Sequence, residues 1–224
     1  MIQGQFLPNK LTDPAIVRAF ESVDRESLLP LSQQGIAYCD HLPCLRDASY
    51  KRYELSSLGF MVLLKHAEIK PHERVLIMGD PTGYASLLVS FLAQQVITLE
   101  QNPMWYAGMS ENVYRVSPHN VTLFNGSYRN GVPSQAPFDC ILVCGNLVVD
   151  YSKLYTQLKP NGRLFGFDPV HVNNSIGRQY HQLCKLYSIH KRERTRTKLI
   201  HSECQAPCIG VFSSEDKNNE IFEL

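Results

Sequence analysis

A glycine-bounded turn and an acidic residue further along are the parts of this sequence best suited to holding a ligand. Residues 79–84 read Gly-Asp-Pro-Thr-Gly-Tyr and follow a short apolar run, and Glu100 closes the next apolar run. Gly79 lets the backbone turn sharply and Gly83 lets a helix start close to a ligand, because neither carries a Cβ. A carboxylate at Glu100 can accept both hydroxyl groups of a ribose. The combination predicts a site for a nucleoside cofactor.

The identity of that cofactor follows from the composition of the turn. Glycine is common between strands and helices, so Gly79 and Gly83 alone are equally consistent with a purely structural turn. NAD is the competing cofactor, but the turn lacks the GxGxxG spacing that cradles a pyrophosphate. Pro81 also removes a backbone donor at the centre of the turn. A cofactor without phosphate therefore fits better.

The elements that must position these residues alternate between strand and helix. Apolar runs of strand length occupy residues 74–78, 95–99, 120–124, 138–143 and 163–167, the last after a turn expected at 160–162. Helical patterns occupy residues 58–69, 85–93, 103–113 and 151–158. This alternation predicts an α/β, Rossmann-like, mostly parallel sheet with helices on both faces. Ligands bind such sheets at the carboxyl ends of the strands, where the glycine turn and Glu100 are expected.

The two ends of the chain have other patterns. Asp13 and Pro14 offer a cap and a first-turn proline for an N-terminal helix, whereas residues 31–54 suggest a loop with short pieces of structure. Residues 179–187 and 194–201 have strand-like content around a basic turn, which predicts a C-terminal antiparallel edge hairpin. Its basic residues suit an edge protected by charge, or a patch for an acidic ligand. We expect an N-terminal helical and substrate segment over 1–70, packed as one compact unit on a core over 71–224.

Charge and cysteine content narrow the class of protein. Lys and Arg number 22 against 21 Asp and Glu, which argues against nucleic acid or a membrane surface as a partner. No run approaches the ~18 apolar residues of a membrane span. The odd count of 7 cysteines and the absence of a secretory pattern at the N-terminus predict a cytoplasmic protein with reduced thiols. Cys140 and Cys144 lie in an apolar run without CxxC spacing, so we expect buried thiols and no metal site.

Several segments of the chain together carry a family resemblance. They include the N-terminal segment 11–26, the approach to the first strand at 69–76, Thr82-Gly83-Tyr84, and the segments 136–139 and 158–164. In these the chain resembles the protein-L-isoaspartate O-methyltransferase family over most of its length. The resemblance implies a class I S-adenosylmethionine-dependent methyltransferase fold. It also implies methyl transfer to the free carboxylate of isoaspartyl residues in damaged proteins or peptides, a protein-repair reaction.

The resemblance also implies roles for individual residues. The implied cofactor contacts are Gly79, Asp80, Thr82, Gly83, Tyr84, Glu100, Gln101 and Ser127. The implied acceptor contacts are Tyr53, Leu55, Ser56 and Ser57, with Ser56 as the candidate catalytic residue. The two serines are equally suited to capping the helix that follows them. Trp105 and Tyr106 could stack on an adenine, or pack in the core as aromatic residues at helix starts commonly do.

The sequence departs from the family pattern at several of these positions. Ile77 stands where the family has an acid, Pro81 where it has its central glycine, and Ser127 where an acid is expected near the adenine. The serine of the family segment T-I-S-x-P aligns with Leu55, or with Ser56 after a one-residue shift. This chain lacks the proline of that segment under both alignments. Two alternatives therefore stay open: a relative that binds cofactor or damaged protein without turnover, and a methyltransferase with another acceptor. The sequence does not determine the oligomeric state or the physiological partner.

Overall fold

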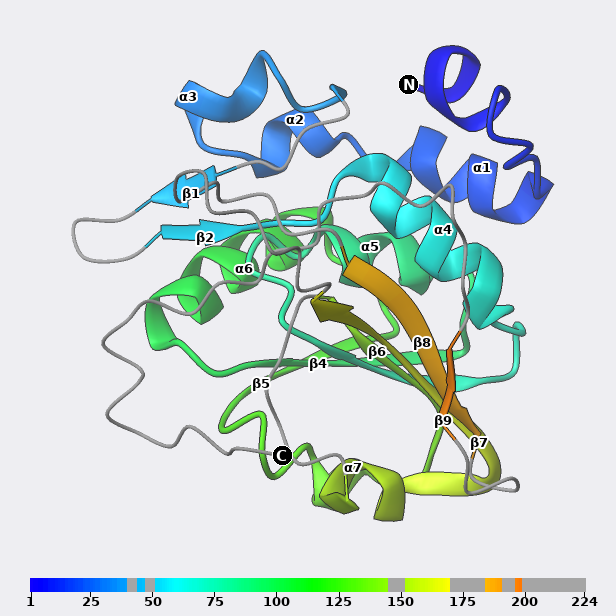
Figure 1. Cartoon of the computed structure of the whole chain (residues 1–224). Coiled ribbons are helices and arrows are strands. Elements are labelled where there is room, and N and C mark those ends of the chain that lie inside the picture. Colours follow the sequence, from blue (N-terminus) through cyan, green and yellow to red (C-terminus); the bar gives the residue numbers. More distant parts are fainter. Residues whose placement is uncertain (40–43, 47–50, 145–151, 170–183, 191–195, 199–224) are drawn as a thin grey trace, which may run out of the picture.

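The structure is a computed structural model that describes residues 1–39, 44–46, 51–144, 152–169, 184–190 and 196–198. Its main element is a 7-stranded sheet in the order β5-β4-β3-β6-β7-β8-β9 (Figure 1). The strands are β3 (Arg74–Met78), β4 (Gln95–Glu100), β5 (Val121–Asn125), β6 (Phe138–Val143), β7 (Leu158–Pro169), β8 (Cys184–His190) and β9 (Arg196–Lys198). The strands from β5 to β7 run parallel. The predicted parallel α/β sheet is thus confirmed.

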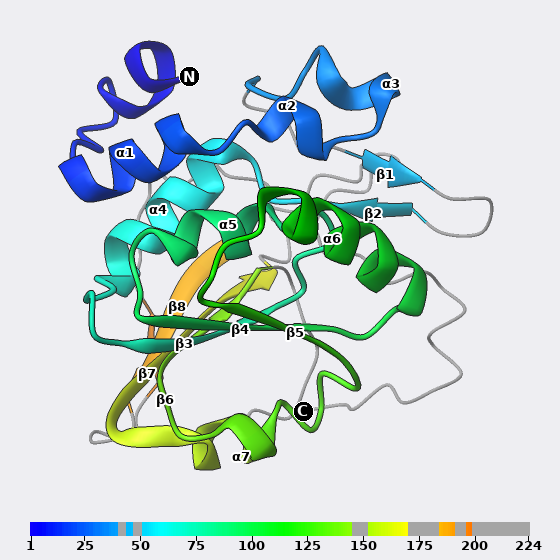
Figure 2. The same ribbon diagram turned by 180° about the vertical axis from the view of Figure 1, so that it is seen from behind.

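Helices lie on both faces of the sheet (Figures 1 and 2). One face is covered by α4 (Ser57–Ala67), α5 (Tyr84–Ser90) and α6 (Pro103–Val116), and the other carries α7 (Ser152–Thr156). The N-terminal part adds η1 (Ile2–Phe6), α1 (Pro14–Ser22), α2 (Arg25–Leu28), α3 (Leu31–Gln34) and a small antiparallel pair, β1 (Cys44–Arg46) and β2 (Lys51–Tyr53). A short 3-10 turn, η2 (Pro133–Gln135), precedes β6. Across the described ranges, the helices are all too short or too polar to traverse a lipid bilayer.

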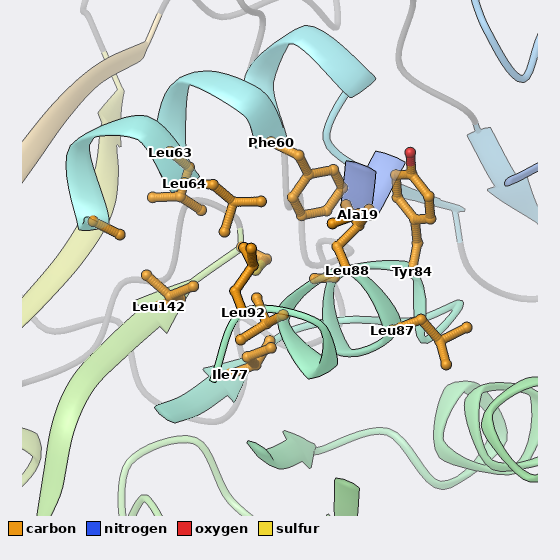
Figure 3. Close-up of a cluster of buried hydrophobic side chains, with 14 of the residues drawn as sticks. Ala19, Phe60, Leu63, Leu64, Ile77, Tyr84, Leu87, Leu88, Leu92 and Leu142 are labelled. Carbon is orange, nitrogen blue, oxygen red and sulfur yellow. The ribbon is translucent and has the colours of Figure 1, made fainter. Parts of the chain in front are cut away.

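The central strands are buried on both faces because their side chains alternate between two cores. Ile77 packs with α4 and α5 in the larger cluster, whereas its neighbours Leu76 and Met78 pack in a second cluster on the opposite face. Figure 3 shows the larger cluster, in which Leu64, Leu88 and Ile77 converge between helix and sheet. Continuous apolar runs are what parallel strands with two covered faces require. This is why the sequence predicted β3, β4 and β6 closely.

Two local predictions concern helix caps and thiols. Asp13 caps α1, because its carboxylate accepts the backbone N–H groups of Ala15 at 2.8 Å and Ile16 at 3.1 Å. Cys140 and Cys144 are buried thiols, as predicted. Burial raises the pKa of the Cys140 thiol to about 12, which disfavours the thiolate that zinc requires. Within the described residues, no group of three or more His, Cys, Asp or Glu side chains could hold a metal ion.

The prediction of a turn at residues 160–162 is wrong, because these residues lie within β7. The pairing of β6 with β7 shifts register between Phe138 and Cys140, so the extra residues of β7 make this part of the strand pair irregular. Gly162 permits this, since a Cβ there would lie 2.9 Å from the carbonyl oxygen of Phe138. The glycine that suggested a turn instead allows the backbones of β6 and β7 to approach each other closely.

The C-terminal part was predicted to form an edge hairpin. In the structure β8 pairs antiparallel with β7, and β9 pairs antiparallel with β8. Residues 179–183, 191–195 and 199–201 lie outside the described residues, so the hairpin itself stays a prediction. The division into segments 1–70 and 71–224 also stays a prediction. Residues of α1, such as Ile16 and Phe20, share the larger core cluster with α5.

Candidate functional site

The glycine turn lies at the carboxyl end of β3, where the strand order reverses. From β3 the chain proceeds to β4 and β5 on one side, and to β6 and β7 on the other. Gly79 and Gly83 have φ angles of 82° and 83°, a region that favours glycine. A Cβ on Gly83 would also lie 2.7 Å from Val113 Cγ2, so α6 packs directly on the turn. Both glycines are therefore needed by the backbone itself, whatever binds beside them.

Asp80 is buried beneath the turn and caps α5. Its carboxylate is fully buried and accepts the N–H of Ala85 at 3.2 Å and the N–H of Ser86 at 2.8 Å. The hydroxyl of Ser86 donates to it at 2.5 Å. Burial, and secondarily the negative charge of Glu54, raises the pKa of Asp80 to about 6. This side chain is occupied inside the protein, so a cofactor contact from Asp80 can come only from its backbone.

Glu100 ends β4 beside the turn. The N–H of Gly79 donates to the carbonyl oxygen of Leu99 at 3.1 Å, which holds the two strand ends together. The Glu100 side chain is fully buried, and its Oε1 accepts the N–H of Asn102 at 3.0 Å. The structure thus places Glu100, the residue predicted to bind the ribose, at the same sheet edge as the glycine turn. A buried carboxylate at this place suits the vicinal hydroxyls of a nucleoside, so the residues fit the predicted kind of cofactor.

Gln101 and Ser127 lie at the neighbouring strand end. Gly126 donates its N–H to the carbonyl oxygen of Glu100 at 3.2 Å, and Gln101 Oε1 accepts the N–H of Tyr128 at 3.1 Å. The residues at 100–101 and 126–128 are therefore adjacent, as a shared cofactor pocket requires. Their role in binding stays a prediction.

The two aromatic residues after Glu100 pack within the protein. Trp105 lies against a small cluster formed by Leu29, Ala37 and Leu45, and Tyr106 lies against the larger core. Their contacts favour the packing interpretation over adenine stacking. Tyr84 is also buried, and its ring meets those of Phe20 and Phe60 edge to face at 6.1 Å and 5.5 Å.

The predicted acceptor segment, residues 53–57, leads from β2 into α4. The side chain of Tyr53 lies outside the described part of the chain, and Leu55 is buried. Ser56 is the N-cap of α4, since its hydroxyl accepts the N–H of Gly59 at 3.1 Å. The hydroxyl of Ser57 accepts from Arg25 Nη1 at 2.9 Å. Of the two serines, Ser56 is thus the capping residue, and a substrate role for it stays a prediction.

Sequence reasoning missed two residues of this site, Arg25 and Glu54. Arg25 Nη2 donates to Glu54 Oε2 at 2.7 Å and to the carbonyl oxygen of Leu55 at 2.6 Å. Both side chains are 1% exposed. Glu54 Oε1 also accepts the hydroxyl of Thr82, a predicted cofactor contact. The pair is separated by 29 positions in the sequence, and no local pattern marks either residue as the partner of the other.

The strand order and the site together define a class I methyltransferase fold, in which a glycine turn and an acidic residue face the same edge of a parallel sheet. Comparisons narrow this further. Residues 7–201 match the sequence profile of the protein-L-isoaspartate(D-aspartate) O-methyltransferase family. The chain belongs to this family.

Individual relatives agree with that assignment. A protein-L-isoaspartate O-methyltransferase of Methanoculleus marisnigri is 28% identical over 214 residues, which cover 95% of this chain and 91% of the relative. One from Koribacter versatilis is 30% identical over 166 residues, covering 73% of this chain and 72% of the relative.

Solved structures support the fold. A protein-L-isoaspartate O-methyltransferase has a TM-score of 0.72 at 21% identity, covering 95% of this chain and 66% of that one. A putative family member from Plasmodium falciparum, solved in complex with S-adenosyl-L-homocysteine, has a TM-score of 0.67 at 19% identity. That match covers 87% of this chain and 91% of the Plasmodium protein.

Proposed function

We propose that this chain is an S-adenosylmethionine-dependent methyltransferase that esterifies the free carboxylate of isoaspartyl residues in damaged proteins or peptides. The observation that carries the proposal is the family match over residues 7–201. It is supported by a site in which the glycine turn and Glu100 meet at one edge of the sheet.

Each part of the site has a distinct task toward the cofactor. Bound S-adenosylmethionine supplies an electrophilic methyl group. Glu100 would accept the ribose hydroxyls, and Gln101 with Ser127 would border the base. Gly79 would allow the backbone to approach the remainder of the cofactor. Asp80 and Thr82 would contribute through their backbone, because their side chains are occupied by Ser86 and Glu54.

The acceptor needs orientation more than acid–base help. A carboxylate is already ionised near neutral pH, so no general base is required to make it a nucleophile. The chain must instead hold the acceptor oxygen in line with the methyl group and exclude water. Residues 54–57 are buried and lie against the turn, with Glu54 contacting Thr82. This segment is the part of the described structure best placed to do both.

A second candidate is a relative that binds cofactor or damaged protein without turnover. The observation in its favour is that both serine hydroxyls of the acceptor segment are already used: Ser56 caps α4 and Ser57 accepts from Arg25. Leu55, at the position of the family serine, offers no hydroxyl.

Two measurements on the purified protein separate these candidates. Calorimetry with S-adenosylhomocysteine tests the cofactor site. Binding should also raise the free energy of unfolding by about 2.7 kcal/mol when the ligand concentration is a hundredfold above Kd. Methyl transfer to an isoaspartyl peptide, with the matched aspartyl peptide as control, tests the reaction. Binding together with isoaspartyl-specific transfer supports the enzyme. Binding without transfer supports the second candidate, and no binding of either S-adenosylhomocysteine or the isoaspartyl peptide contradicts both.

A cytoplasmic location and the absence of nucleic-acid or membrane partners remain predictions from the sequence. The reduced thiols of Cys39, Cys140 and Cys144 are compatible with that location. Cell fractionation with a tagged full-length chain tests the location.

A further inference from the structure

Two buried charged residues join three parts of the chain that are distant in sequence. Arg25 begins α2, Glu54 lies in the predicted acceptor segment, and Thr82 lies in the glycine turn. The Glu54 carboxylate contacts Arg25 through one oxygen and Thr82 through the other. The Glu54 side chain therefore ties the acceptor segment to the turn.

A second connection runs through the Arg25 guanidinium. Its Cζ lies 4.5 Å from the centre of the Tyr84 ring, so the cation rests on an aromatic residue of the turn. The same guanidinium holds the carbonyl of Leu55 and the hydroxyl of Ser57. The Arg25 guanidinium thus holds residues 54–57 in place and also contacts the turn.

Asn112 of α6 adds a third connection. Its side-chain amide donates to the carbonyl oxygen of Leu28 at 3.1 Å and to that of Thr82 at 2.9 Å. The end of α2 and the glycine turn are consequently held by one residue. Movement of the turn on ligand binding would be transmitted to α2 and, through Arg25, to the acceptor segment.

Buried ion pairs are a poor way to gain stability. The loss of hydration often exceeds the attraction between the charges, and apolar side chains of similar volume can fill the same space at lower cost. Such a pair instead fixes the relative position of the segments that carry it, because each hydrogen bond holds one donor against one acceptor. The pair also neutralises Glu54, whose isolated charge would repel an anionic acceptor nearby.

We infer that Arg25 and Glu54 are positioning residues that hold the acceptor segment against the glycine turn and couple acceptor affinity to the cofactor site. The inference rests on the proposed function for the identity of the acceptor. The contacts themselves belong to this chain and stand without it.

Thr82→Val tests the coupling, because valine matches the shape of threonine but cannot donate to Glu54. Losing a hydrogen bond to a charged group corresponds to roughly a tenfold or greater change in affinity. We expect the KM for an isoaspartyl peptide to rise about tenfold, and by a larger factor than any change in kcat at saturating peptide or in the Kd of S-adenosylhomocysteine. Thr82→Ser restores the hydroxyl and should return the KM to the parent value.

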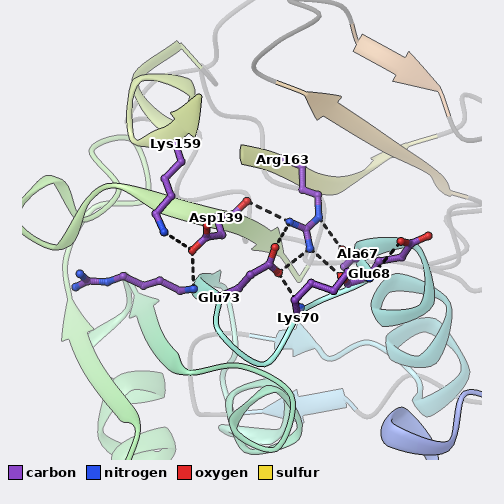
Figure 4. A network of polar contacts seen from close by, with 8 residues as sticks. Ala67, Glu68, Lys70, Glu73, Asp139, Lys159 and Arg163 are labelled. Carbon is purple, nitrogen blue, oxygen red and sulfur yellow. Dashed lines mark hydrogen bonds and ion pairs between the residues drawn. The ribbon is translucent and has the colours of Figure 1, made fainter. Parts of the chain in front are cut away.

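Glu73→Gln is the matched control at the opposite end of the sheet. Glu73 pairs with Arg163 through two contacts of 2.8 Å, in a network that also includes Asp139 and Lys159 (Figure 4). This variant weakens an Arg–Glu pair far from the turn. It should lower the melting temperature and leave the peptide KM unchanged.

Hydrogen exchange gives a readout that needs no activity. In the ligand-free protein, Thr82→Val should accelerate amide exchange in peptides covering residues 54–57, and Glu73→Gln should not. If the parent methylates no isoaspartyl peptide, the proposed function fails, and the exchange result still decides the inference. Unchanged exchange at 54–57 in Thr82→Val, or equal acceleration there in Glu73→Gln, overturns it.

Discussion

Asp80 accepts both the backbone N–H and the side-chain hydroxyl of Ser86, at 2.8 Å and 2.5 Å, from a position with no exposed surface. Ser86 Oγ in turn lies 2.7 Å from the hydroxyl oxygen of Thr98 in β4. The start of α5 is therefore fixed to the sheet through a carboxylate of the glycine turn. This arrangement makes the turn sensitive to the protonation of Asp80.

Asp80→Asn should change the pH dependence of stability. The pKa of Asp80 rises from 3.8 to about 6 on folding, mainly through burial and then through the charge of Glu54. The folded protein then holds the proton more tightly than the unfolded chain, so the free energy of unfolding falls as the pH rises through this window. The difference is about 3 kcal/mol.

Urea unfolding at pH 4 and pH 7 measures this slope. The asparagine variant does not titrate and should lose about 2 kcal/mol less than the parent between the two values, because part of the total effect already lies below pH 4. Titrating groups that do not interact with Asp80 are common to both proteins and cancel. Equal losses in parent and variant would show that Asp80 titrates normally.

Glu100→Gln should weaken cofactor binding more than folding. The glutamine keeps the size of the buried side chain and can still accept the N–H of Asn102, but it loses the charge. A charge-assisted hydrogen bond contributes roughly 1.5–3 kcal/mol, so we expect a Kd for S-adenosylhomocysteine about ten- to a hundredfold higher. Calorimetry measures the Kd, and Asp139→Asn, at the other end of the sheet, is the control. Parent-like affinity in Glu100→Gln would remove this residue from the cofactor site.

The two serines of the acceptor segment should differ in their effect on stability. Ser56→Ala removes the cap of α4 and should cost about 1 kcal/mol. Ser57→Ala leaves a buried donor of Arg25 without its hydroxyl, which should cost about 1–3 kcal/mol. Thermal unfolding compares them. A larger loss of stability in Ser56→Ala than in Ser57→Ala would show that the cap of α4 contributes more than the contact with the Arg25 guanidinium.

Turnover by Ser56→Ala tests the predicted substrate role separately. If the hydroxyl orients the acceptor as well as capping α4, turnover on an isoaspartyl peptide should fall ~10²-fold at a temperature where the variant is folded. Ser57→Ala at the same temperature is the control. Full activity in Ser56→Ala would leave that residue with the capping role alone.

Gly83→Ala should destabilise the protein, and Gly108→Ala should not. The first places a Cβ at a φ of 83° and 2.7 Å from Val113 Cγ2, so strain and overpacking add. A cost of about 1–3 kcal/mol is expected. Gly108 lies within α6 with no atom within 4 Å of an added Cβ, so alanine should stabilise by roughly 0.5–1 kcal/mol. Denaturant melts of both variants measure the contrast, and a neutral Gly83→Ala would mean that α6 can move away from the turn.

The sequence by itself determined the elements whose signals are local. The runs at 74–78 and 138–143 coincide with β3 and β6, because strands buried on both faces must be apolar throughout. The cap at Asp13 and the place of the glycine turn before α5 follow from the same local chemistry. Family membership also followed from the sequence, since it depends on segments whose order and residue types are preserved.

Only the tertiary structure decided what depends on distant partners. Turn-like residues at 160–162 lie inside β7, because the strand pairs with β6 on both sides of them, at Leu158 and from Arg163 onward, and this pairing overrides a local turn preference. Asp80 became a buried cap, and Arg25 and Glu54 became partners across 29 residues of chain. A charged side chain gives no sign in sequence of whether water or a buried partner will satisfy it. Folding settles that, because an unpaired charge in the interior costs far more than one left in solvent.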